Sequence, residues 1–379
     1  MKVALFVTHL LGTGHLARTF VLARALSAEG HTACVVSGGV PAPHLNAQNV
    51  GLIQLPSLRS DGVNFTRLLA ADGQPASQAV LAERRKQAVD ALRAFGPDVV
   101  VTELFPFGRR ILADEFKAVI EAASRLDPRP LICCSIRDIL APPSKPAKAA
   151  ATDALVDQFY DAVLVHSAAE ITPLQASWSV SPMLESKLHY TGFVAPSPAG
   201  PHKDKAGDGR ILVSAGGGAV GDKLFETALE AARLTPDLEW HLLVGGGQAE
   251  ARIANLRALN PVSAIVEPVR PDFRSMLYHT KASVSMCGYN TALDVLQSGS
   301  PAVFVPFDDG GETEQTLRAR TLAHLDGIEV LSNAELTPGS LADAVRASQK
   351  APRRQPMREG MDGGAETVRI LTRLREAMI

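Results

Sequence analysis

A histidine lies in the first glycine-rich loop of the chain. Residues 10–26 read LLGTGHLARTFVLARAL and follow the apolar run VALFV, so the sequence predicts a strand, a turn that holds Gly14 and His15, and a helix. The macrodipole at a helix start disfavours an imidazolium, so His15 would be a neutral ring that can accept a proton. A helix-capping or core histidine is the structural alternative.

The same loop also fits the GxGxxA pattern of dinucleotide-binding sheets over residues 12–17. That pattern requires an acidic residue at the end of the second strand, where it holds a ribose. The expected second strand, TACVVS, ends at Ser37 and is followed by Gly38 and Gly39, so no carboxylate lies at its end. We therefore expect no dinucleotide, and no other cofactor.

A second stretch, residues 287–301, combines glycines with polar residues that could hold an anion. It reads CGYNTALDVLQSGSP and predicts a strand that ends at Gly288 and a helix that begins at once and ends at Gly299. The next strand would lead into the polar loop DDGGETEQ.

The start of that helix offers groups for a phosphorylated nucleoside. Backbone N–H groups at Asn290 and Thr291, together with the Thr291 hydroxyl, would form a phosphate site. Asp294, one turn later, could accept hydrogen bonds from both hydroxyls of a ribose. The alternative for Asp294 is an ordinary surface position on an amphipathic helix.

Apolar runs alternate with helical stretches along the whole chain. Because these runs lack strict alternation, they indicate parallel sheets covered on both faces. We predict an α/β fold of two Rossmann-like doubly wound domains that face a cleft: residues 1–195, a linker over 196–209, and residues 210–360. The expected strands of the first half are VALFV, TACVVS, GLIQL, DVVVTE, LICCSI and AVLVHS. The second half opens with a strand, a glycine-rich loop and a helix over RILVSAGGGAVGDKLFETALEAARL, and the further strands are EWHLLVGGG, SAIVEP, ASVSMCG and PAVFVPF.

Composition excludes several classes of function. The net charge of −2 over 379 residues gives no basic footprint for nucleic acid. No apolar run reaches the ~18 residues of a membrane span, and the N-terminus shows no signal-peptide pattern. Four cysteines in apolar surroundings suit buried thiols in a reducing cytoplasm. There is no HExxH or CxxC motif, and we assign Asp308 and Asp309 to the polar loop rather than to a metal site.

The second half resembles the family 28 glycosyltransferases of the GT-B fold. The resemblance rests on the order of a glycine, a threonine three residues later, an acidic residue six later, then glycine, proline, VPF and a glutamine-bearing loop. It implies that the last segment, residues 361–379, is a helix that packs back on the first domain. It also implies a nucleoside-diphosphate sugar, UDP-linked, as donor.

Carried over by position, the family's donor site falls on residues of both halves. The helix start and two glycine loops would approach the diphosphate, the acidic residue the ribose, backbone near Val269 the base, and the glutamine loop the sugar. The implied residues are Gly14, Gly216, Gly217, Gly218, Val269, Arg270, Gly288, Asn290, Thr291, Asp294, Glu314 and Gln315. Two positions depart from the family: the acidic residue is Asp where the family usually has Glu, and the loop has one glutamine rather than two.

The resemblance implies inverting, metal-independent transfer to an acceptor hydroxyl, with His15 as general base. Glu103, Arg137 and Asp138 are candidates on the acceptor side, with an Arg137–Asp138 salt bridge as the alternative. The acceptor itself is unknown, and a lipid acceptor would bring peripheral membrane contact. The GTGHLAR motif also resembles the nucleotide-sugar hydrolase of pseudaminic acid synthesis, where water replaces the acceptor. A non-catalytic nucleotide-sugar binder and an epimerase remain alternatives.

Overall fold

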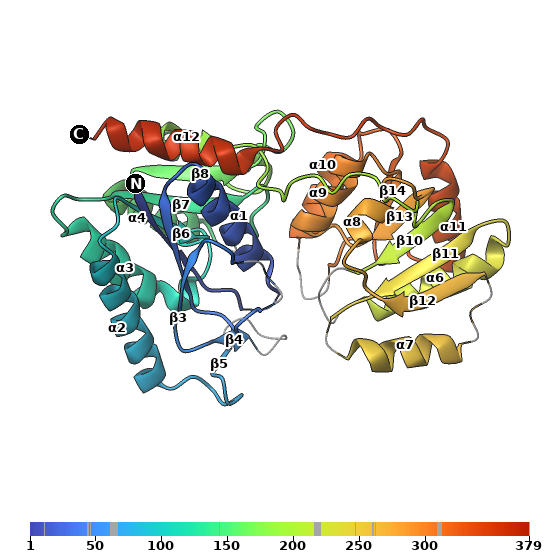
Figure 1. The fold of residues 1–379 in the computed structure, drawn as a ribbon, viewed down its shortest axis with the longest axis horizontal. Coiled ribbons are helices and arrows are strands. Elements are labelled where there is room, and N and C mark those ends of the chain that lie inside the picture. The colour runs from blue at the N-terminus through green and yellow to red at the C-terminus, as the bar shows by residue number, and fades with distance from the viewer. Residues whose placement is uncertain are drawn as a thin grey trace. The chain divides into compact units, whose positions relative to one another are not determined.

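The computed structural model divides the chain into two compact units (Figure 1). The first comprises residues 1–196 and 360–379, and the second comprises residues 197–359. The structure describes residues 1–10, 12–43, 45, 47–60, 67–143, 145–215, 221–246, 248–259, 261, 263–308 and 313–378.

The first unit is built on a parallel sheet with strand order β3-β2-β1-β6-β7-β8-β9. Consecutive buried residues in these strands face opposite layers, which explains their continuous apolar runs. A short antiparallel pair, β4 (Arg59–Ser60) and β5 (Leu68–Leu69), lies apart from the sheet. The sheet strands are β1 (Lys2–Val7), β2 (Thr32–Ser37), β3 (Gly51–Gln54), β6 (Val99–Glu103), β7 (Leu131–Arg137), β8 (Ala162–His166) and β9 (Leu188–Tyr190).

Helices cover both faces of this sheet (Figure 1). One core joins the sheet to α2 and α3, and the other joins it to α1 and α12. The final helix, α12, packs on α1 so closely that a Cβ on Gly364 would lie 3.2 Å from the Cβ of Ala25. The helices are α1 (Gly14–Ala28), α2 (Gln78–Phe95), α3 (Ala113–Ser124), α4 (Pro146–Phe159), α5 (Pro182–Lys187) and α12 (Gly363–Glu376), with 3-10 turns at Arg110–Leu112 and Leu174–Ala176.

The second unit repeats the plan with strand order β12-β11-β10-β13-β14-β15, again all parallel. Its core joins the sheet to α6, α7 and α11. The strands are β10 (Arg210–Ser214), β11 (Glu239–Val244), β12 (Ala264–Pro268), β13 (Ala282–Ser285), β14 (Ala302–Phe304) and β15 (Ile328–Val330). The helices are α6 (Asp222–Leu234), α7 (Ala249–Ala258), α8 (Phe273–Met276), α9 (Tyr289–Ser298), α10 (Glu314–Leu322) and α11 (Pro338–Ser348).

The predicted α/β class, with two doubly wound sheets and a C-terminal helix on the first domain, is confirmed. In each sheet the strand order reverses next to the first strand, between β1 and β6 and between β10 and β13. Doubly wound sheets bind ligands beyond the carboxyl ends of their strands at such a switch point. In the part of the chain that the structure describes, the helices are too short or too polar to cross a bilayer.

The segment predicted as a linker is fastened to the second unit over much of its length. His202 Nε2 lies 3.0 Å from Asp272 Oδ2, and the backbone N–H groups of Asp204 and Ala206 donate to His202 Nδ1. Gly207 has a φ of +86° and its backbone lies against Met276, where a Cβ would come within 3.0 Å of the Met276 carbonyl oxygen. Residues 202–207 therefore pack as part of the second unit.

Candidate active site

His15 and Glu103 form a pair at the switch point of the first sheet. His15 is in the first turn of α1, directly after β1, and Glu103 is the last residue of β6, which is hydrogen-bonded to β1. The Nδ1 atom of His15 lies 2.9 Å from Glu103 Oε1, and their side chains are only 12% and 4% exposed. We call this pair the His15–Glu103 dyad.

Burial keeps the histidine of the dyad neutral, and the neighbouring charges keep its carboxyl ionised. Burial, opposed by the hydrogen bond to Glu103, lowers the pKa of His15 to about 3, and the nearby charges of Arg109 and Arg137 lower it further. Burial disfavours the charge of Glu103, but Arg18 and the hydrogen bond from His15 outweigh it and hold its pKa below the usual range. Because the carboxylate only accepts, the Nδ1 of His15 carries the proton and Nε2 keeps its lone pair.

The structure brings one more predicted acceptor-side residue to the dyad. Arg137, the last residue of β7, lies close enough for its charge to act on His15. Asp138 follows it and is 2% exposed. Arg18, which sequence reasoning missed, donates from Nη2 to Glu103 Oε1 and is itself buried. Its position three residues after His15, on the same helix face, is the sequence signal that could have found it.

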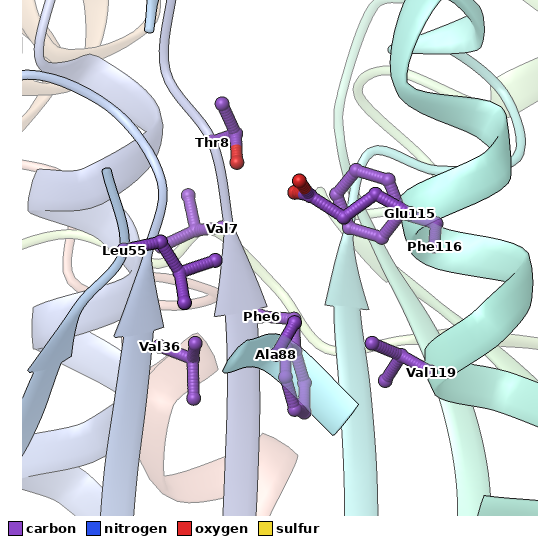
Figure 2. A pocket seen from close by; sticks show the side chains of 9 residues that line it. All are labelled: Phe6, Val7, Thr8, Val36, Leu55, Ala88, Glu115, Phe116 and Val119. Atoms are coloured by element: carbon purple, nitrogen blue, oxygen red, sulfur yellow. The ribbon is translucent and has the colours of Figure 1, made fainter. Parts of the chain in front are cut away.

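A small cavity in the first unit lies within the core that joins the sheet to α2 and α3 (Figure 2). Its free space is about 10 Å³, enough for about one water molecule and too small for an acceptor. Its carboxylate, Glu115, receives two hydrogen bonds from Arg84, of 2.9 and 2.8 Å. The cavity is lined by Phe6, Val7, Thr8, Val36, Leu55, Ala88, Glu115, Phe116 and Val119.

The start of α9 lies at the switch point of the second sheet, directly after β13. Gly288 is the N-cap, and no side chain caps this helix start in the described structure. Asn290 is exposed and Thr291 is half-buried. The helix ends at Ser298, with Gly299 in the left-handed conformation at φ +65° as its C-cap, so the predicted helix and its end are confirmed. An uncapped helix start of this kind suits an anion.

Asp294 is held by an arginine that sequence reasoning missed. Arg274, in α8, donates from Nε to Asp294 Oδ1 at 2.7 Å and from Nη2 to Gln297 Oε1 at 2.8 Å. Among the described residues none donates to Asp294 Oδ2, so this oxygen has acceptor capacity left. Burial raises the pKa of Asp294, and Arg274 opposes that rise. The two residues are 20 positions apart with no local pattern, so the sequence carried no signal for this contact.

The two residues predicted to hold the donor sugar begin α10. Glu314 is buried, and its Oε1 accepts from Nη2 of Arg318 at 2.9 Å. Arg318 also donates from Nη1 to the Cys287 carbonyl oxygen at 2.9 Å. This arginine therefore ties α10 to the turn before α9, and its spacing of four residues from Glu314 is a recognisable helix pair. The side-chain oxygen of Gln315 accepts from the Phe307 N–H at 3.2 Å.

The other predicted donor contacts are distributed over loops. Gly216, Gly217 and Gly218 lie outside the described residues. Val269, after β12, is 51% exposed, and its N–H donates to the Val244 carbonyl oxygen at 3.0 Å. Arg270 donates to both oxygens of Asp272, at 2.8 and 2.6 Å. Gly14 is the first residue of α1 and so adjoins His15.

Known proteins resemble both the second unit and the whole fold. The model of the glycosyltransferase family 28 C-terminal domain matches residues 211–370. The predicted resemblance to family 28 is confirmed.

Curated relatives match about half of the chain. The UDP-N-acetylglucosamine–N-acetylmuramyl-(pentapeptide) pyrophosphoryl-undecaprenol N-acetylglucosamine transferase of Brucella anthropi is 30% identical over 185 residues, 47% of this chain and 49% of that protein. The same enzyme of Brucella suis biovar 1 is 28% identical over 189 residues, 48% and 50% of the two chains. This chain therefore spans about half the length of the curated relatives that it matches.

Solved structures match the chain over nearly its full length. The crystal structure of Acinetobacter baumannii MurG has a TM-score of 0.60 at 18% identity, covering 98% of this chain and 100% of that one. The glycotransferase of kitacinnamycin has a TM-score of 0.65 at 18% identity, covering 100% and 98%. At such identities the likeness establishes the fold, which is GT-B.

Proposed function

We propose that the protein is a glycosyltransferase that moves a sugar from a nucleoside-diphosphate donor to an acceptor hydroxyl, with inversion at the anomeric carbon and without a metal ion. The observation that carries the proposal is the His15–Glu103 dyad, a neutral histidine whose Nδ1 proton is held by an ionised carboxylate. The family 28 domain in the second unit supports a nucleotide sugar as its partner.

His15 acts as the general base in this proposal. Its Nε2 takes the proton of the acceptor hydroxyl while the acceptor oxygen forms a bond to the anomeric carbon and the bond to the diphosphate oxygen breaks. Glu103, already ionised, stabilises the imidazolium that forms, as the carboxylate does in other His–carboxylate pairs. Attack from the face opposite the leaving group inverts the anomeric configuration.

The start of α9 receives the leaving nucleoside diphosphate. N–H groups in the first turn and the helix dipole stabilise the negative charge that develops on the phosphate oxygens. The Thr291 hydroxyl adds a donor, and the free Oδ2 of Asp294 accepts from the ribose.

The donor base is inferred from the relatives. The names of the Brucella enzymes specify UDP-N-acetylglucosamine, which supports UDP as the carrier here. All four cysteines are free and buried, which is typical of a reducing compartment and supports the cytoplasm. The acceptor follows from neither observation. The relatives act on an undecaprenol-linked acceptor, so a lipid-linked hydroxyl with peripheral membrane contact belongs among the acceptors to test.

The first experiment is a thermal-shift titration of the full chain with UDP, dTDP, GDP, CMP and NAD, each with and without EDTA. A rise in Tm with UDP alone, unchanged by EDTA, is the expected result. A rise with NAD alone would contradict the proposal and return the GTGHLA loop to dinucleotide binding. If EDTA abolished the rise in Tm that UDP causes, the proposal that the donor binds without a metal ion would be wrong.

Turnover of the donor then separates transfer from hydrolysis. Labelled UDP-sugars are incubated with a panel of hydroxyl acceptors, and both glycosylated product and free sugar are quantified. Transfer predicts product that depends on the acceptor. Free sugar released at a rate that no acceptor changes would instead assign the dyad to a hydrolase, with water as the nucleophile.

A further inference from the structure

A chain of buried polar side chains continues behind Glu103, away from His15. Ser135 Oγ donates to Glu103 Oε2 at 2.6 Å and lies 2.9 Å from His166 Nε2. His166 Nδ1 in turn lies 2.8 Å from Thr191 Oγ1. These three residues, which we call the buried relay, are each no more than 2% exposed.

Strand register explains why the relay forms. Glu103 and Ser135 are directly paired on β6 and β7, and Arg137 is paired with His166 on β7 and β8. Side chains two residues apart on a strand share a face, so Ser135 and His166 project from the same face of the sheet at its carboxyl edge. The neighbours Cys133 and Leu164 on that face belong to the core beneath α1.

The distances assign the protons of the relay. Ser135 has a single hydroxyl proton, and the ionised Glu103 at 2.6 Å is the strongest acceptor it contacts. The Ser135 oxygen therefore accepts the Nε2 proton of His166. Because burial keeps His166 neutral, its Nδ1 has no proton and accepts the hydroxyl proton of Thr191.

The protons of the relay have an opposite arrangement, but it leaves the charge of Glu103 with one hydrogen-bond donor fewer. The Thr191 hydroxyl also lies 2.8 Å from the Gly192 carbonyl oxygen and could donate there. His166 would then carry its proton on Nδ1, and Ser135 would donate to His166 instead of Glu103. That arrangement removes the donor from one oxygen of a buried carboxylate, which is costly.

We propose that Ser135 and His166 are positioning residues that fix the rotamer and the charge of Glu103 and thereby tune the base His15. With Oε2 held by Ser135, the other carboxylate oxygen is directed at His15 and Arg18. The charge of Glu103 is shared among three donors, His15, Arg18 and Ser135, which limits how far this carboxylate raises the pKa of His15. The mechanistic part of this inference rests on the proposed function, whereas the proton arrangement does not.

The charged groups that face His15 come from several elements. Arg109 in the loop after β6 and Arg137 at the end of β7 oppose protonation of the ring, and Glu103 favours it. Arg18, on the same helix as His15, places its Nη2 atom 3.4 Å from His15 Nδ1. Removing the Ser135 hydroxyl leaves these charges in place. The net effect on His15 is then an increase of its pKa, because Glu103 loses a donor that shared its charge.

The test compares Ser135→Ala, His166→Leu and His166→Gln in the full chain, with Gln as the matched control because its amide can still donate to Ser135. We expect kcat to fall about tenfold for Ser135→Ala, less for His166→Leu, and little for His166→Gln, with the donor KM unchanged. In a plot of kcat against pH, the limb at low pH should move to higher pH, most for Ser135→Ala, less for His166→Leu and least for His166→Gln. Loss of stability without a shift of that limb would overturn the proposal.

A spectroscopic readout keeps the inference separate from the activity. Chains labelled with ¹⁵N-histidine report the proton position on His15 and His166 through two-bond ¹H–¹⁵N spectra, and His15→Gln and His166→Gln spectra assign the signals. We expect Nδ1–H on His15, Nε2–H on His166, and a higher midpoint for His15 in Ser135→Ala. Absent turnover with these signals present would refute the proposed function alone. The opposite tautomer on His166, or an unchanged His15 midpoint, would refute the relay.

Discussion

The two units place different chemistry at the same position of the same architecture. At the switch point of the first sheet, β1 and β6 bring together ionisable side chains that are buried and hydrogen-bonded to one another. At the switch point of the second, β10 and β13 lead to a helix start that carries no side-chain cap in the described residues. We propose that the first site holds a proton in a defined place and that the second receives negative charge. A doubly wound sheet therefore fixes where a site lies but not what it does.

The sharpest test of this contrast removes the base. His15→Ala should lower kcat by about 10²–10⁴-fold, because no group remains to take the acceptor proton. The dissociation constant of UDP, measured by calorimetry, should stay within about twofold of the wild-type value. A variant with normal turnover would remove the first unit from the chemistry.

A negative charge placed at the switch point of the second sheet should weaken UDP binding, which the removal of His15 leaves nearly unchanged. Thr291→Asp puts a carboxylate in the first turn of α9, where it repels a diphosphate, and we expect UDP to bind about 10- to 100-fold more weakly. The same charge favours the helix dipole, so Tm should not fall. Thr291→Ser is the control that keeps the hydroxyl. Equal UDP affinities in the Asp and Ser variants would contradict anion binding at this helix.

The ribose contact should have a smaller effect. Asp294→Asn keeps the shape of the side chain but weakens the hydrogen bonds that Oδ2 accepts, so UDP should bind about tenfold more weakly. The preference for UDP over 2′-deoxy-UDP, measured by competition, should shrink in the variant. A preference that stays as large as in the wild type would assign Asp294 to its structural contact with Arg274 alone.

The remaining expected effect is on the pH dependence of stability rather than on turnover or UDP binding. The folded pKa of His15, about 3, lies below the ordinary value of 6.5, so below pH 6.5 the unfolded chain binds a proton that the folded chain does not. Stability should therefore fall as pH drops from 6.5 towards 3, by about 1.4 kcal/mol per pH unit from this residue. Urea unfolding at pH 4 to 7 should give a shallower slope for His15→Gln. Identical slopes would show that His15 is not desolvated.

Sequence patterns predicted the elements better than the contacts between them. The strand runs, the helix that starts after Gly288, and its end at Gly299 all follow from local rules of periodicity and backbone conformation. The sequence analysis did not predict the short strands β9 and β15, because three residues are too few to show a hydrophobic periodicity.

Long-range partners could not be read in the same way. Glu103 is 88 residues from His15, and their contact depends on β6 lying next to β1, which only the strand order reveals. The pairing of Arg274 with Asp294 likewise depends on how α8 meets α9. The sequence therefore predicted His15, Glu103 and Asp294 as candidate site residues, but not which side chains contact them.

The packing of α12 on α1 means that the second unit is an insertion within the first. The chain enters the second unit after Pro196 and leaves it before Gly360, so the first unit is assembled from two separate pieces of sequence. During synthesis the inserted unit is complete on the growing chain while its host still lacks the helix that covers α1. Removal of residues 360–379 would then uncover apolar residues of α1 in the first unit, and leave the contiguous second unit with its own core intact. The insertion thus makes the last twenty residues part of the environment of the first helix, whose opening turn bears His15.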